Sequence, residues 1–135
     1  MIPRGSLGRV MVIDDTEVDQ LMCRRVLARS KMATDMIEFT CAEAALAYLA
    51  DPSEPPVDLI LLDINMPRMT GFEFLDAADR ILGAGCLPTV MILLGGPLTG
   101  ADSRRAAGFA QIKGHCNKPL AAQHLHMAAG LLRAS

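Results

Sequence analysis

The chain has 135 residues, of which 51% are hydrophobic and 21% charged, and its formal net charge is −2 at pH 7. A chain of this length is expected to form one domain with a substantial core, and its composition excludes intrinsic disorder. The nearly balanced charge gives no reason to expect nucleic-acid binding, and no apolar run reaches the roughly 20 residues that a membrane span needs. We therefore expect neither nucleic acid nor membrane among its partners.

The cysteines and the first residues bear on location and domain limits. Cys23, Cys41, Cys86 and Cys116 are widely spaced and form no CxxC pair. Two of them fall on predicted core faces, so we interpret them as free thiols of a cytoplasmic protein and not as zinc ligands. The first six residues, MIPRGS, resemble the remnant of an engineered protease site, and the predicted domain therefore spans residues 7–135.

Short apolar strands alternate with amphipathic helices in the first half of the chain. Residues 9–14 (RVMVID) predict a buried strand, and residues 36–40 (MIEFT) predict a second, shorter one. A helix is predicted between them, over about residues 17–30. Its predicted apolar stripe consists of Val18, Met22 and Val26, with Cys23 and Leu27 alongside.

The next predicted helix follows residue 40. Thr40 and Glu43 have the spacing of a capping box at its start. The sequence DPSEPP ends this helix, because prolines close together cannot continue one. Its predicted buried face consists of Ala42, Ala45, Leu46 and Leu49.

The same alternation continues in the second half. The stretch VDLILLDINMP, residues 57–67, predicts a third strand that is apolar from Leu59 to Leu62 and then reaches Asp63. Residues 88–94 (PTVMILL) predict a fourth strand that ends at two glycines, and residues 113–117 (KGHCN) contain a short fifth one. Three further helices are predicted: one marked by Phe74, Leu75, Ala78 and Leu82, one over about residues 100–107, and a final one carrying Leu125, Ala129 and Leu132.

Strands that alternate with helices predict an α/β fold. Right-handed crossovers between parallel strands place helices on both faces of the sheet. Five such strands suit a doubly wound, flavodoxin-like sheet of order 2-1-3-4-5, in which the apolar third strand lies in the middle. Ligands of these folds bind beyond the carboxyl ends of the strands, where Asp63 is expected.

Four charged residues are expected to meet at this edge of the sheet. Asp14 and Asp15 end the first strand, Asp63 ends the third, and Lys118 follows the fifth. Three like charges close together require a compensating cation, and oxygen ligands suit Mg²⁺. Such a site could bring a phosphoryl donor to Asp63, which would act as the nucleophile and form an acyl phosphate, while the metal and Lys118 neutralise the developing charge.

Three motifs in this order carry a family resemblance. VMVIDD, DLILLDINMPRMTGFEFL and NKPL together resemble the receiver domain of two-component response regulators, from about residue 9 to residue 132. The resemblance implies that Asp63 is the phosphorylation site and Lys118 the phosphoryl-contacting lysine. It also implies that Asp14, Asp15, Asp63 and the backbone carbonyl of Asn65 hold Mg²⁺, and that the peptide bond before Pro119 is cis.

The resemblance further implies a signalling role for the chain. The expected function is phosphoacceptor of a two-component phosphorelay and not an enzyme with a separate substrate. The expected partners are a histidine kinase or histidine phosphotransfer protein and a downstream protein. We expect no output domain after the last predicted helix, and a stand-alone regulator and an excised receiver both stay open.

Two switch positions depart from the receiver pattern. Gly95 stands where receivers usually have threonine or serine, and His115 stands where they usually have tyrosine or phenylalanine. The hydroxyl and the aromatic ring normally move together on phosphorylation. An alternative function is therefore a degenerate receiver that acts as a phosphorylation-independent interaction module.

Other interpretations of the acids carry less weight. Asp14 and Asp15 could serve only as acids at a helix N-terminus, where they are favoured without a metal. A haloacid-dehalogenase-like phosphatase also uses a strand-end aspartate, but it expects a second acid two residues on, where this chain has Asn65. Flavin binding is disfavoured because no phosphate-cradling loop follows the first strand.

Overall fold

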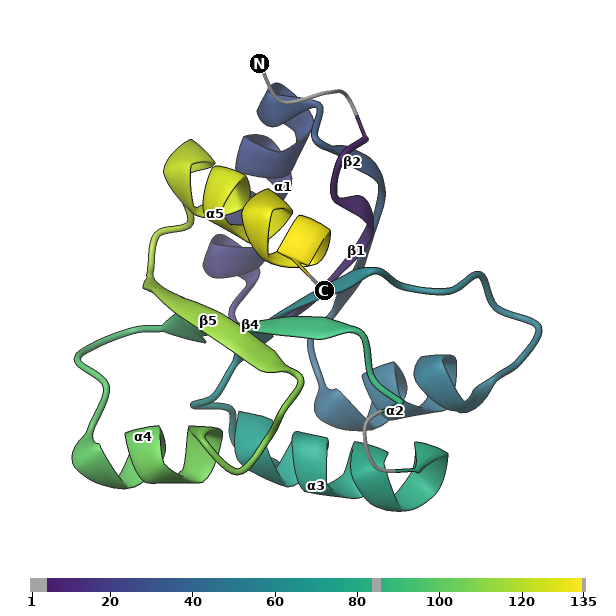
Figure 1. Cartoon of the computed structure of the whole chain (residues 1–135), viewed down its shortest axis with the longest axis vertical. Coiled ribbons are helices and arrows are strands. Elements are labelled where there is room, and N and C mark those ends of the chain that lie inside the picture. The colour runs from purple at the N-terminus through teal and green to yellow at the C-terminus, as the bar shows by residue number, and fades with distance from the viewer. Residues whose placement is uncertain (1–4, 84–85, 135) are drawn as a thin grey trace.

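The computed structural model describes residues 5–83 and 86–134. Strands and helices alternate within them: β1 (Gly8–Ile13), α1 (Glu17–Ser30), β2 (Ala33–Phe39), α2 (Ala42–Ala50), β3 (Leu59–Asp63), α3 (Gly71–Leu82), β4 (Thr89–Leu94), α4 (Gly100–Ala106), β5 (Ile112–Asn117) and α5 (Ala122–Ala134). The strands form one parallel sheet in the order β2-β1-β3-β4-β5 (Figure 1). The predicted fold class and strand order are confirmed.

The sheet separates two helical layers and two cores. Helices α1 and α5 cover one face, and α2, α3 and α4 cover the other (Figure 1). Along β3, Leu59 and Leu61 pack into the α1/α5 core, whereas Ile60 and Leu62 pack into the opposite one. Since successive side chains of a strand point to opposite faces, a strand covered on both sides must be apolar at every position. All five residues of β3 are buried, which explains the apolar run from Leu59 to Leu62, and only the last residue, Asp63, is polar.

The apolar stripe predicted for α1 is wrong at two positions. The structure leaves Val18 64% and Met22 37% exposed, and the buried residues of the helix are Gln20, Cys23 and Leu27. Steps of four residues drift around a helix, so the stripe through Val18 and Met22 turns away from the face through Cys23 and Leu27. A glutamine occupies the first buried position on that face, and an apolar pattern cannot reveal it.

The capping box predicted for α2 is also wrong. The helix begins at Ala42, so Cys41 is the N-cap, and its side chain makes no capping hydrogen bond. Thr40 lies one residue too early to cap, and its side chain is exposed. The predicted buried face of α2 is confirmed, because Ala42, Ala45 and Leu46 are buried and Leu49 packs against the same core.

A capping box exists instead at α3. The Oγ1 atom of Thr70 accepts a hydrogen bond from the Glu73 backbone N–H at 3.2 Å, and Oε1 of Glu73 accepts one from the Thr70 N–H at 2.9 Å. These two bonds satisfy two backbone donors that the helix leaves without partners in its first turn. They fix the start of α3 a few residues after Asp63.

The remaining expectations concern the termini and the cysteines. Of the six residues interpreted as a remnant, residues 1–4 lie outside the described residues, while Gly5 donates its N–H to the carbonyl of Lys31 at 3.0 Å. Cys23 and Cys116 are buried free thiols, Cys41 is partly buried, and Cys86 is exposed. In the part of the chain that the structure describes, no helix has the length and apolarity needed to cross a membrane.

Candidate functional site

The three predicted acids meet at one edge of the sheet. Ile13 lies beside Leu62 in the parallel register of β1 and β3, so the residues that follow them, Asp14 and Asp63, are neighbours. Carboxylate oxygens of Asp14, Asp15 and Asp63 lie within 4.8 Å of one another. Asp14 is 0% and Asp63 3% exposed, whereas Asp15 is more open to solvent.

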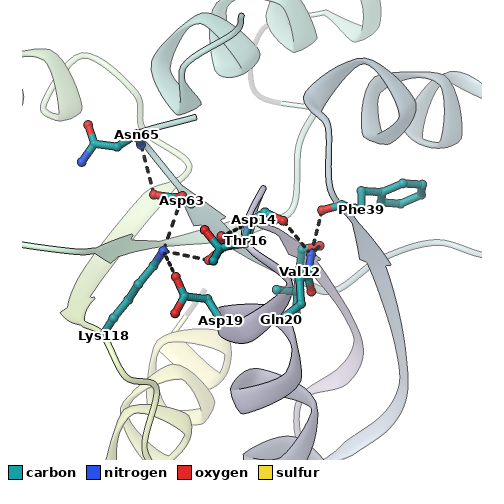
Figure 2. A network of polar contacts seen from close by, with 9 residues as sticks. All are labelled: Val12, Asp14, Thr16, Asp19, Gln20, Phe39, Asp63, Asn65 and Lys118. Atoms are coloured by element: carbon teal, nitrogen blue, oxygen red, sulfur yellow. Dashed lines mark hydrogen bonds and ion pairs between the residues drawn. The ribbon is translucent and has the colours of Figure 1, made fainter. Parts of the chain in front are cut away.

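Each buried carboxylate is oriented by the turn that follows its strand. Oδ1 of Asp14 accepts a hydrogen bond from the Thr16 N–H at 3.0 Å, and Oδ1 of Asp63 accepts one from the Asn65 N–H at 3.0 Å. Aspartate commonly accepts such a bond from the backbone two residues on. In both residues this leaves Oδ2 as the atom that faces the lysine (Figure 2).

Lys118 brings the positive charge to these acids. It follows β5 and precedes Pro119 through a cis peptide bond, as expected, and its backbone N–H donates to the Leu94 carbonyl at 2.7 Å. Its Nζ lies 2.8 Å from Oδ2 of Asp14 and 3.4 Å from Oδ2 of Asp63. The structure thus brings together all four charged residues that the sequence singled out.

A third carboxylate contacts the lysine besides those of Asp14 and Asp63, and the sequence analysis did not identify it. Asp19 lies in the first turn of α1, and its Oδ2 accepts a hydrogen bond from Nζ of Lys118 at 2.8 Å (Figure 2). A signal existed in the sequence, because Asp19 is an acid near the start of the helix predicted to follow Asp14 and Asp15. The direction of the Asp19 side chain could not be inferred, because the sequence pattern predicted the wrong buried face for α1.

Gln20 is the second functional residue that the sequence did not reveal. Its side chain is buried, and Nε2 donates to the backbone carbonyls of Phe39 at 2.8 Å and Asp14 at 3.1 Å (Figure 2). A longer contact of 3.4 Å reaches the carbonyl of Val12. The glutamine therefore ties the end of β1 to the end of β2 and holds the backbone that carries Asp14.

Burial and neighbouring charges act in opposite directions on the ionisable groups. Burial raises the pKa of Asp63 above its ordinary value, and the Asn65 N–H and Lys118 oppose this rise without cancelling it. Burial alone would lower the pKa of Lys118, but its close contacts with the carboxylates of Asp14 and Asp19 outweigh this effect and hold that pKa above its ordinary value. Lys118 therefore remains a cation at neutral pH.

The donor set fits a small, hard cation. Oδ2 of Asp14 is buried and, among the described residues, accepts no hydrogen bond, although it forms the ion pair with Lys118. Carboxylates outnumber the single ammonium, and oxygen-only ligands suit Mg²⁺. Asn65, the fourth predicted ligand, follows Asp63 closely, and its exposed side chain points away from the acids (Figure 2).

The two positions predicted to be atypical switch residues, Gly95 and His115, lie after β4 and within β5. Leu93 is the register partner of Asp63, so Gly95 lies just past the edge of the sheet, and a Cβ added there would meet no atom within 4 Å. The next hydroxyl along the chain, that of Thr99, accepts a hydrogen bond from the Asp102 N–H at 3.0 Å and caps α4. His115 is exposed on β5, paired with Ile92 in register.

Comparisons with known proteins agree with this geometry. A family model for the response regulator receiver domain matches residues 10–129. The two-component response regulator ORR5 of Oryza sativa subsp. japonica is 34% identical over 91 residues, covering 67% of this chain and 65% of the relative. Stress response regulator protein 1 of Meyerozyma guilliermondii is 35% identical over 72 residues, covering 53% of this chain and 32% of that protein. The chain thus spans about a third to two thirds of the length of these relatives.

Solved structures share the fold at lower identity. A two-component response regulator from Cytophaga hutchinsonii has a TM-score of 0.81 at 20% identity, covering 96% of this chain and 98% of that one. The Mn²⁺-bound form of response regulator Rcp1 has a TM-score of 0.70 at 22% identity, covering 91% and 90%. These likenesses show the fold, and the family match extends over most of the sheet and all four charged residues. The chain belongs to the receiver domains of two-component response regulators.

Proposed function

We propose that this receiver accepts a phosphoryl group on Asp63 from a phosphohistidine of a histidine kinase or histidine phosphotransfer protein. The observation that carries the proposal is the position of Asp63, whose Oδ2 lies 3.4 Å from the Lys118 ammonium beside the second buried acid, Asp14. Oδ1 of Asp63 is held by the Asn65 N–H, so Oδ2 is the oxygen available for attack.

The proposed step forms one bond and breaks one. Oδ2 of Asp63 attacks the phosphorus atom, a P–O bond forms, and the P–N bond to the donor imidazole breaks with its electron pair passing to the imidazole nitrogen. The product is an acyl phosphate on Asp63. Lys118 is placed to donate to a phosphoryl oxygen, because its Nζ already faces Oδ2 of the nucleophile.

Asp14, Asp15, Asp63 and the backbone carbonyl of Asn65 are the proposed ligands of Mg²⁺. The bound ion would neutralise charge on the phosphoryl oxygens. A divalent ion in the receiver-like neighbour Rcp1, described as the Mn²⁺-bound form, supports the assignment. In this proposal the domain is a cytoplasmic signalling phosphoacceptor that catalyses only its own phosphorylation and dephosphorylation, and it passes its state to a downstream protein.

A second candidate function rests on the switch positions. Beside and just beyond Asp63, the chain has Leu93, Leu94 and Gly95, none of which has a hydroxyl group. The exposed His115 stands where receivers usually have an aromatic ring. These observations favour a degenerate receiver that binds a partner regardless of phosphorylation. The intact acids and Lys118 favour the phosphoacceptor, which is therefore the function proposed first.

Phosphorylation from a small donor tests the proposal. The purified protein is incubated with acetyl phosphate or phosphoramidate, with Mg²⁺ or with EDTA, and examined by intact mass spectrometry. We expect one phosphoryl group with Mg²⁺, none with EDTA, and none in Asp63→Asn. The control Asp76→Asn removes an exposed acid on α3 and should be phosphorylated as the wild type is. Phosphate uptake by Asp63→Asn, or none by the wild type with Mg²⁺, would refute the assignment.

A further inference from the structure

The Lys118 ammonium has three N–H donors and three carboxylate neighbours. Nζ lies 2.8 Å from Asp14, 2.8 Å from Asp19 and 3.4 Å from Asp63. Its side chain is only 17% exposed, so water has little access to replace these partners. A phosphoryl oxygen on Asp63 can accept a hydrogen bond from Nζ only if one of these carboxylates loses its contact with an N–H donor of the lysine.

Asp19 differs from the other two carboxylates in its position. Asp14 and Asp63 belong to the group of acids that could hold a metal ion, whereas Asp19 does not. It approaches Lys118 from the side of α1, and its side chain is 27% exposed. If the carboxylates of Asp14 and Asp63 coordinate a metal ion, Asp19 remains as the counter-ion of Lys118. Its place in the first turn of α1 also favours its negative charge.

We propose that Asp19 is a positioning residue that holds the Lys118 ammonium and competes for it with the phosphoryl group on Asp63. This inference rests on the proposed phosphoacceptor function. Replacing the carboxylate by an amide keeps the size and an acceptor oxygen but turns a charge-assisted hydrogen bond into a weaker, neutral one. The lysine is then freer to bind the phosphoryl oxygen, so Asp19→Asn should bind the phosphoryl analogue beryllofluoride about three- to tenfold more tightly.

A matched variant separates this effect from a simple loss of negative charge. Glu17 is exposed in the same first turn of α1, and Glu17→Gln removes the same charge without touching Lys118. Dissociation constants for beryllofluoride at saturating Mg²⁺ are compared for the wild type, Asp19→Asn and Glu17→Gln. We expect tighter binding in Asp19→Asn alone. In a Lys118→Met background, Asp19→Asn should have no effect, because the contested ammonium is gone.

A second readout does not depend on phosphorylation or metal. In the metal-free protein, the ¹⁵N-edited NMR signal of the Lys118 ammonium reports its hydrogen bonds. Asp19→Asn should shift this signal and speed its exchange with water, and Glu17→Gln should leave both unchanged. An ammonium signal that responds equally to both variants overturns the inference.

The outcomes distinguish this inference from the proposed function. If the wild type accepts phosphate but Asp19→Asn binds beryllofluoride no more tightly than Glu17→Gln, the competition is refuted and the phosphoacceptor function stands. Weaker binding in Asp19→Asn also refutes it, since Asp19 would then assist the phosphoryl contact. If the wild type accepts no phosphate, the proposed function fails, and the ammonium signal alone decides whether Asp19 holds Lys118.

Discussion

At the scale of single residues, the two buried thiols are the simplest groups to probe. Burial raises the pKa of Cys23 to about 12 and that of Cys116 to about 11, and nearby Asp14 adds to the shift at Cys23. Only the thiolate reacts with alkylating agents. At about pH 8 both groups stay protonated, because this pH lies well below both shifted pKa values.

Alkylation of the native protein should therefore separate the four cysteines. With iodoacetamide, we expect modification of the exposed Cys86 first, slower modification of the partly buried Cys41, and none of Cys23 or Cys116. Peptide mass spectrometry after quenching measures each site. The same reaction in guanidinium chloride, where all four should react, is the control. Early labelling of Cys23 in the native protein would contradict the burial of α1 against the sheet.

We expect a hydroxyl at Gly95 to strengthen the coupling between the proposed phosphoryl site and α4. Threonine fits there without a clash, because a Cβ at Gly95 meets nothing within 4 Å. A hydrogen bond to a charged phosphoryl oxygen contributes roughly 1.5–3 kcal/mol, which can shift a two-state equilibrium about ten- to a hundredfold. We expect beryllofluoride with Mg²⁺ to shift the amide NMR signals of residues 100–118 little in the wild type and more in Gly95→Thr.

The neighbouring glycine provides the control for this experiment. Gly96 is equally open, so Gly96→Thr introduces the same side chain one residue farther along. Its response should stay close to that of the wild type. A wild-type response as large as that of Gly95→Thr would mean that another group already couples the phosphoryl site to α4.

The residues of the site were predictable in part, for a physical reason. Asp14, Asp63 and Lys118 lie at the carboxyl ends of strands, and parallel strands bring these ends to one edge, so the predicted strands placed the three residues together. Asp19 and Gln20 lie on a helix, and their direction depends on how α1 is rotated against the sheet. The apolar residues Val18 and Met22, which are exposed in the structure, indicated the wrong rotation of α1 about its axis. The roles of Asp19 and Gln20 therefore could not be assigned from the sequence.

At the scale of elements, the two candidate capping boxes give a direct comparison. Thr70 caps α3 with both reciprocal hydrogen bonds, whereas Thr40 precedes the N-cap of α2 and is exposed. Thr70→Ala should lower the free energy of unfolding by about 1 kcal/mol. Thr40→Ala should change it by less than about 0.5 kcal/mol. Urea denaturation with a common slope measures both, and equal losses would show that Thr40 also caps a helix.

The type and order of the elements followed from the sequence, while some of their ends did not. Apolar runs such as that of β3 identify strands covered on both faces, and the alternation of five strands with helices predicted the flavodoxin-like strand order. Edge strand β2 begins at Ala33, three residues before the expected strand, because Thr34 and Asp35 are exposed there and carry no apolar signal. An edge strand needs no apolar run to pair with its neighbour through backbone hydrogen bonds.

At the scale of the whole molecule, the cluster of acids should link metal binding to stability. If Mg²⁺ binds the folded site as proposed and not the unfolded chain, at ten times its dissociation constant it should add about 1.4 kcal/mol of stability. For a domain of this size, this corresponds to a rise in Tm of about 3–6 °C. Thermal unfolding followed by circular dichroism, with and without MgCl₂, measures the rise.

Two controls make this prediction specific. KCl at equal ionic strength should raise Tm less, because it only screens the charges. Asp15→Asn should begin with a Tm at or above that of the wild type, since one like charge is gone, but should gain less from Mg²⁺. An equal gain in Asp15→Asn would place the metal elsewhere.

The pairing of β1 with β3 also determines when the acidic edge of the sheet, with Asp14 and Asp63, can form during folding. It joins Val10 to Leu59, with α1, β2 and α2 in the intervening chain. Closing so long a segment costs entropy before any contact compensates for it, whereas single helices form within microseconds. A partly folded chain can therefore hold its helices and still lack the neighbouring tips of β1 and β3. Such a species has no place for the metal, so the site assembles only once the centre of the sheet has closed.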